Sequence, residues 1–260
     1  MCDNTSRNIY SERHVIFMAD FFTQTSSDLT YGYDSTRADV ANELFRKVYG
    51  YMAMGLILTS LMAYFTASSR AMLEFFFSSQ VPMLVVAVAE IGLVIFLSSA
   101  INRIESSTAL ICFAAYSILN GILCSSVLLV YTQESVHQAF FTTAGMFGAM
   151  SLYGLFTKRD LTSWGSFLTM GLFGIIIASV INLFFGSMRA DFVISILGII
   201  IFLGLTAWDT WKIKNLANEI GFDSQQSGAV SKVAIIGALA LYLDFVNIFL
   251  YLVRLFGRRK

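Results

Sequence analysis

Residues 233–256 read VAIIGALALYLDFVNIFLYLVRLF, an apolar run with one aspartate, Asp244, at its middle. About 20 residues at about 1.5 Å each span the hydrocarbon of a bilayer, so this run predicts a membrane-crossing helix. A carboxylate at that depth costs at least about 2.5–3.5 kcal/mol. We therefore expect Asp244 to face protein or a water-filled cavity together with other polar groups.

The composition predicts a membrane protein for the whole chain. Of its 260 residues, 57% are hydrophobic and 13% are charged, whereas about 25% of a soluble domain is charged. The net charge is zero, so no nucleic-acid partner is expected. The expected fold is all-α and polytopic, and the first expected partner is the lipid bilayer.

Hydropathy predicts seven membrane-crossing helices joined by mostly short connections. The apolar runs are residues 48–66, 81–101, 108–131, 139–156, 164–185, 192–211 and 233–256. The link from Lys212 to Lys232 is polar, and a short helix is predicted over residues 216–220. Residues 46–260 are thus the predicted membrane domain.

Residues 1–45 are mostly polar, and no basic segment is followed there by an apolar one. A cleaved signal peptide is therefore not expected. We interpret this stretch as a poorly ordered cytoplasmic tail.

The distribution of Lys and Arg predicts the orientation. With a cytoplasmic N-terminus, the inner segments hold eleven Lys and Arg and the outer loops hold only Arg70 and Arg189, as the positive-inside rule requires. The last run leaves two alternatives open. A full crossing places Arg258, Arg259 and Lys260 outside, whereas re-entry keeps them inside. Length and unbroken helical character favour the full crossing.

Enzymatic and metal-binding motifs are missing from the sequence. Its three cysteines and two histidines form no CxxC or HExxH motif, and no P-loop or G-x-G-x-x-G occurs. We expect no cofactor and no enzymatic activity.

Ionisable residues within the apolar runs are the candidate functional residues. Glu90 and Asp244 are predicted near the midplane, and Arg103 and Asp209 near the cytoplasmic face. Two carboxylates in one dry site cannot both ionise cheaply, so such a pair can act as a proton switch. Asn247 shares the face of Asp244 one turn along the helix.

Structural interpretations of the same acidic residues stay open. Asp209 is alternatively an interfacial aspartate that reaches water beside Lys212. Glu90 and Asp244 are alternatively hydrogen-bonded by span residues of the Ser, Tyr or Asn type, for which Ser117, Asn120 and Asn182 are candidates.

Four segments resemble the Bax inhibitor-1 family (transmembrane Bax inhibitor motif proteins), and most closely its bacterial members. They are GMFGAMSLYG (145–154), TKRDL (157–161), TAWDTWKIK (206–214) and GALALYLDFVNIFL (237–250). The resemblance covers residues 45–260. It implies seven helices, with the last one central and wrapped by two groups of three. Trp208 and Trp211 depart from the tyrosine and glutamine expected around the first aspartate, which affects the local packing.

The resemblance also implies a pH-dependent calcium leak across a membrane, which for a bacterial member is the inner membrane. Its pH-sensing aspartate pair matches Asp209 and Asp244, and a latching arginine on the second helix is best matched by Arg103. Pairing is hard to reconcile with depth: a helix entering the membrane at Lys232 puts Asp244 about 18 Å deep and Asp209 only about 5 Å deep. The last helix would have to begin below the membrane, or the bundle would have to tilt.

The function expected from the sequence is therefore a pH-sensitive cation (calcium) leak channel. Its predicted pathway residues are Arg103, Glu90, Asn247 and the pair Asp209 and Asp244, which would also hold permeating calcium transiently. A non-conducting regulator that binds other membrane proteins or proteases is the alternative, followed by a secondary transporter.

Overall fold

The computed structural model describes residues 39–101, 103–220, 227–258 and 260, and this part of the chain is helical without a strand. The first helix spans Asp39–Ser68. The others are α2 (Arg70–Phe77), α3 (Gln80–Ala100), α4 (Ser106–Val130), α5 (Gln133–Phe156), α6 (Thr162–Phe185), α7 (Met188–Ile220) and α8 (Ser227–Phe256). Seven of these are long and apolar enough to cross a membrane, which confirms the predicted all-α polytopic fold.

The polar tail predicted for residues 1–45 falls mainly on residues 1–38, which lie outside the described residues. The first helix already begins at Asp39. The boundary between tail and membrane domain stays a prediction.

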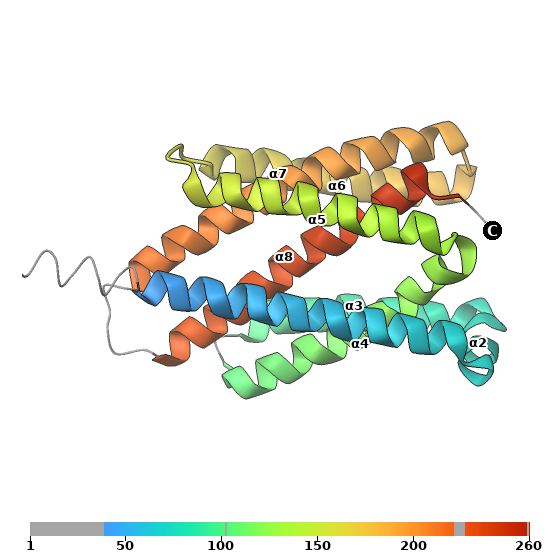
Figure 1. Cartoon of the computed structure of the whole chain (residues 1–260), viewed down its shortest axis with the longest axis horizontal. Helices are drawn as coiled ribbons and strands as arrows, with labels where there is room; N and C mark the ends of the chain where they lie inside the picture. The colour runs from blue at the N-terminus through green and yellow to red at the C-terminus, as the bar shows by residue number, and fades with distance from the viewer. Residues whose placement is uncertain (1–38, 102, 221–226, 259) are drawn as a thin grey trace, which may run out of the picture.

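Helix α8 is the centre of the bundle, as predicted. It runs between the first helix, α3 and α4 on one side and α5, α6 and α7 on the other (Figure 1). In its most apolar window 61% of the residues are buried, against 11% for α3 and for α6. Its apolar side chains therefore pack against protein, while those of α3 and α6 face outward, where lipid satisfies them.

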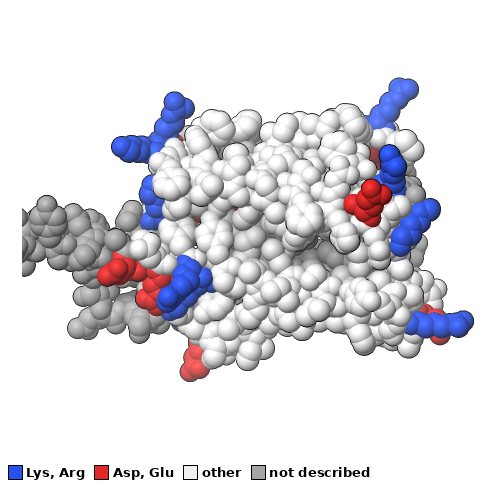
Figure 2. Space-filling view, viewed as in Figure 1, with Lys and Arg blue, Asp and Glu red and all other residues white. Residues whose placement is uncertain are grey.

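The surface pattern fits a bilayer. On the face seen in Figure 2, charged side chains gather toward the two ends of the bundle and the band between them is free of charge. Phe141, Phe173 and Leu183 are among the large apolar side chains that are exposed. In water such a belt would be unfavourable, whereas in lipid it needs no partner.

Helix ends differ from the sequence prediction around α7 and α8. The segment after Trp211 was predicted to be a polar link, but α7 continues without a break to Ile220. The short helix predicted at 216–220 is therefore the end of α7. Helix α8 already begins at Ser227. Hydropathy marks where a helix lies in lipid and is blind to its polar extension into water. The connection between the first helix and α3 also carries α2, which hydropathy missed because it has only eight residues.

Helix α8 extends along the whole bundle, from the end where α7 finishes to the opposite end (Figure 1). Of the two alternatives for this run, the geometry thus agrees with the full crossing rather than re-entry.

Candidate functional site

Three cavities follow one another along α8. The lysine cavity, about 210 Å³, is lined by Asp209, Lys212, Lys232 and Ala240 among others. The aspartate cavity, about 560 Å³, is lined by Asp209, Ala240, Asp244, Glu90 and Asn247 among others. The α4–α8 cavity, about 470 Å³, is lined by Glu90, Asn247, Tyr131 and Arg254 among others. Neighbouring cavities share lining residues, so they form one series.

Asp244 is the most deeply buried carboxyl residue of this series. Only 3% of its surface is exposed, and its Oδ2 atom is buried without a hydrogen-bond partner. In the described part of the chain, the only other buried side-chain polar atom in this situation is Thr66 Oγ1. An unpartnered carboxyl oxygen in an interior is costly, so Asp244 is poised to interact with an ion, a proton or water.

Asp209 of α7 lies beside Asp244 and lines the same cavity. It is only partly buried and also borders the lysine cavity. Both ways around the conflict of depth are present, because α8 begins at Ser227, before its apolar run, and crosses the bundle obliquely (Figure 1). Asp209 is therefore the member of the pair closer to water.

Trp208 explains how α7 accommodates the departure from the family pattern. Its indole packs on Gly165 of α6, where an added Cβ would lie 2.2 Å from the ring. Lys212 Nζ covers the same ring at 5.0 Å from its centroid. The close approach of α6 and α7 thus depends on this glycine, and it fixes the segment that carries Asp209.

Glu90 of α3 is held by a neighbouring helix. Asn120 of α4 donates its Nδ2–H to Glu90 Oε1 at 2.5 Å, and its Oδ1 accepts from the Cys124 thiol at 3.3 Å. The structure therefore contains the hydrogen bond that the structural alternative for Glu90 predicted, from an asparagine within a membrane-crossing helix. Ser117 and Asn182 serve elsewhere, because they donate to Phe113 O and Asp191 Oδ1.

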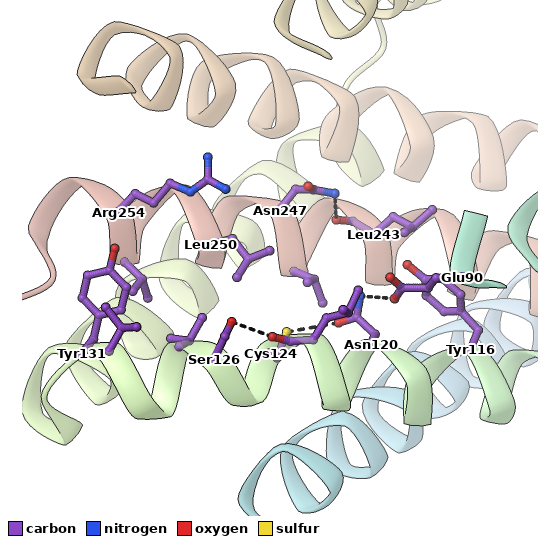
Figure 3. A pocket seen from close by; sticks show the side chains of 15 residues that line it. Glu90, Tyr116, Asn120, Cys124, Ser126, Tyr131, Leu243, Asn247, Leu250 and Arg254 are labelled. Carbon is purple, nitrogen blue, oxygen red and sulfur yellow. Dashed lines mark hydrogen bonds between the residues drawn. The ribbon is translucent and has the colours of Figure 1, made fainter. Parts of the chain in front are cut away.

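Asn247 stands where the aspartate cavity and the α4–α8 cavity meet. Its Nδ2 donates to Leu243 O one turn back, at 2.8 Å. Figure 3 shows Asn247 and Arg254 on α8 across from Tyr131, Ser126 and Asn120 on and next to α4. With Asp244 and Tyr251 they lie at helical spacings of three and four residues, so α8 carries one polar stripe toward these cavities.

Arg103 is not brought to the aspartates. It is exposed in the α3–α4 turn, where its backbone N–H donates to Ala100 O. The ion pairs found in the described residues, Lys47–Glu43 and Arg70–Glu74, do not include it. Ile101, two residues before it, lines the lysine cavity together with Asp209. The arginine latch stays a prediction.

The sequence analysis missed several polar lining residues, among them Tyr116, Cys124, Tyr131 and Arg254. For Cys124, a signal existed in its spacing of four residues from Asn120, which puts both on one face of α4. Arg254 was visible as a charge within the last run, but its proximity to a chain end made it look like a snorkelling side chain.

A resident metal site is not evident in the part of the chain that the structure describes, where no group of three or more His, Cys, Asp or Glu could hold an ion. Calcium takes six to eight oxygen ligands. Two aspartates and an asparagine amide supply only part of such a set, so transient calcium binding by Asp209 and Asp244 stays a prediction.

Comparisons with known proteins agree with this architecture. The model of a family described as inhibitor of apoptosis-promoting Bax1 matches residues 41–260. Over 214 residues the chain is 44% identical to the inner membrane protein YbhL of Escherichia coli (strain K12), covering 82% of this chain and 91% of that protein. Over 221 residues it is 42% identical to an uncharacterized protein of Borreliella burgdorferi, covering 85% and 94%.

Proposed function

Because this chain belongs to the Bax inhibitor-1 family, we propose that it is a multi-pass inner membrane protein through which cations, calcium among them, leak in a pH-dependent manner. The inner membrane location follows from the similarity to YbhL, an inner membrane protein of Escherichia coli. The leak is proposed from the geometry along α8 together with the family resemblance.

The observation that carries the proposal is the length of the cavity series. Its lining residues on α8 run from Lys232 to Arg254. At 1.5 Å per residue this is about 33 Å, close to the roughly 30 Å thickness of bilayer hydrocarbon. The polar stripe of α8 accompanies the part of this length from Asp244 to Arg254, about 15 Å, where it offers a hydrated cation a route that lipid does not.

The aspartate pair supplies the pH dependence in this proposal. Asp209 and Asp244 line one cavity, and two ionised carboxylates there repel each other. A proton shared between them, or a cation, relieves the repulsion. Glu90 also faces this cavity, and Lys212 is the nearest charged group on α7.

The sign of the pH effect depends on what holds the pathway shut. A latch between Arg103 and the pair needs an ionised aspartate, so it is strongest at high pH and is lost on protonation. Flux should then rise as the pH falls. Arg103 is exposed in the α3–α4 turn, so the latched state requires its side chain to turn toward Asp209.

We also place the N-terminus in the cytoplasm. The Lys and Arg count favours it. Of the basic residues after α8, Lys260 donates its Nζ to Leu128 O at 2.7 Å, at the carboxyl end of α4, where helix carbonyls favour a cation. The charge of Lys260 thus has a local partner on the outer side.

Calcium flux into liposomes, measured against pH, tests the function. The wild type should show flux that rises toward acidic pH, while Asp209→Asn and Asp244→Asn should lose most of that dependence. Asp160→Asn is the matched control, because Asp160 is an exposed loop aspartate whose amide variant should keep the wild-type profile.

An unchanged pH profile in Asp244→Asn would contradict the role of the pair. Wild-type protein that gives no flux at any pH would contradict the channel itself and leave the non-conducting regulator as the better interpretation.

A further inference from the structure

The segment that follows α8 is tied to the turn between α4 and α5. Thr132 N–H donates to Arg258 O at 3.0 Å, and Lys260 N–H donates to Val130 O at 2.9 Å. Arg258 N–H also donates to Ser135 Oγ at 3.0 Å. We call Gly257, Arg258 and Lys260 the strap. Three backbone donors are satisfied across this contact, so the strap has a defined place rather than a loose one.

Two further features fit the strap to this place. Lys260 Nζ donates to Leu128 O, a carbonyl of the last turn of α4. A Cβ added to Gly257 would lie 2.5 Å from the Tyr131 ring and 2.2 Å from Val253 O. Only a glycine allows this approach of the strap to Tyr131.

The strap binds residues that line one end of the α4–α8 cavity. Val130 and Tyr131 line this cavity from the α4 side, and Val253 and Arg254 line it from the α8 side. Figure 3 places Tyr131 and Arg254 opposite each other at that end. Since α4 and α8 are the two walls, a bond between their ends fixes how far apart the walls stand.

We propose that the strap is a clamp that keeps the cavity narrow at the end beside the α4–α5 turn, and that its release widens the cavity and lets water in faster. Control of access is independent of what the cavity conducts. Control of ion flux by the strap rests on the proposed function.

Thr132 offers a clean way to break the clamp. Its φ of −69° is the value that a proline ring requires. Tyr131 before it is extended, with φ −107° and ψ 154°, which is the conformation allowed for a residue that precedes proline. Thr132→Pro removes the N–H that donates to Arg258 O. Thr132→Ala is the matched control, because both variants lose the Thr132 side chain that caps α5 at Ser135 N–H, but only proline loses the strap bond.

Access is read from a cysteine placed in the cavity. Ser126 lines the α4–α8 cavity, so Ser126→Cys is introduced after Cys2, Cys112 and Cys124 have been replaced by serine. The probe is a charged, membrane-impermeant methanethiosulfonate acting on the purified full chain. One lost hydrogen bond should speed labelling about three- to tenfold in Thr132→Pro relative to Thr132→Ala. Equal rates in the two variants would overturn the proposal.

A second pair of variants applies if Thr132→Pro fails to fold. Gly257→Ala pushes the strap away from Tyr131 and should also speed labelling, whereas Gly174→Ala, whose Cβ meets nothing within 4 Å, should not. Equal labelling in this pair likewise overturns the clamp. The flux assay is run in parallel. Faster labelling without a change in calcium flux supports the clamp and shows that the strap does not control flux. Slower or unchanged labelling counts against the clamp alone, and absence of wild-type flux counts against the channel.

Discussion

Glu90 on α3 and Asp244 on α8 bury carboxyl groups that border the same cavity, with 8% and 3% of their surfaces exposed. Their hydrogen bonding differs. Glu90 accepts a short hydrogen bond from Asn120, whose own oxygen is in turn occupied by Cys124. Asp244 has an oxygen with no partner among the described residues.

The difference separates a structural acid from a reactive one. A buried polar group with a fixed partner adds rigidity, whereas a buried group without one destabilises the fold and stays free for another ligand. We therefore expect Glu90 to shape the cavity and Asp244 to answer to protons or cations. The predictions that follow test this contrast.

The largest effect should come from removing the partner of Glu90. Asn120→Leu leaves a buried carboxyl without its donor, which should lower the free energy of unfolding by about 1–3 kcal/mol. Unfolding in mixed detergent micelles, followed by circular dichroism, measures it. Replacing both partners, Glu90→Leu with Asn120→Leu, should recover much of the loss, and a double variant as unstable as the single one would show that the pair is not coupled.

The same substitution should act in opposite directions on the two acids. Asp244→Leu removes a buried carboxyl with one unpartnered oxygen and should raise the free energy of unfolding by about 1–2 kcal/mol. Glu90→Leu leaves the Asn120 amide without its acceptor and should lower it. If both variants shift stability in the same direction, the contrast between the two sites is wrong.

Tyr242 extends the comparison to another face of α8. Its hydroxyl contacts Thr59 Oγ1 at 2.5 Å, and Thr59 Oγ1 donates to Ser117 O. Because Thr59 spends its only proton on Ser117, the Tyr242 hydroxyl is the donor in its contact. Tyr242→Phe should therefore cost only about 0.5–1.5 kcal/mol, since no buried donor is orphaned.

Thr59→Val is the companion variant for that measurement. It removes the hydroxyl that bonds to both Ser117 O and Tyr242 Oη, so the buried Tyr242 donor loses its acceptor. This variant should destabilise the protein more than Tyr242→Phe. The reverse order would mean that Tyr242 accepts, and that the direction inferred for this chain of hydrogen bonds is wrong.

The helices were predictable from the sequence because the signal is local. An apolar run of about 20 residues decides a span whatever its neighbours are. The ends of α7 and α8 were not predictable in this way, because polar residues after Trp211 and before Val233 continue the helices outside the apolar runs. That continuation and the oblique course of α8 bring Asp209 and Asp244 to one cavity (Figure 1).

The candidate site was predictable only in part. Asp209, Asp244, Glu90 and Asn247 were visible as polar residues in apolar surroundings, and they do line one cavity. Which of them has a partner was not visible, because Asn120 is thirty residues from Glu90 in sequence and on another helix. The strap was invisible for the same reason, since its place depends on the distant Tyr131.

The smallest effect is expected at Asp160, a carboxylate that water reaches freely. It precedes α6, and its Oδ1 accepts from Thr162 Oγ1–H at 2.5 Å and Thr162 N–H at 2.8 Å. These bonds favour the charged form and lower the pKa of Asp160. The bond from the Thr162 hydroxyl lowers it more than the bond from the Thr162 backbone N–H. Because the folded-state pKa is depressed, its stabilisation is present above the unfolded value near 3.9 and is lost as the pH falls through the folded value.

Thr162→Ala should raise the Asp160 pKa part of the way to its ordinary value, because the backbone donor remains, and Thr162→Ser should leave it where it is. The carboxyl carbon of labelled aspartate, followed by NMR against pH, reports both. An equal shift in the two variants would mean that the hydroxyl is not the cause. Protonation of an exposed carboxyl is thus tuned by one donor on a neighbouring residue, whereas the protonation of Asp244 depends on another helix and on what enters its cavity, which suits it to sense more than pH alone.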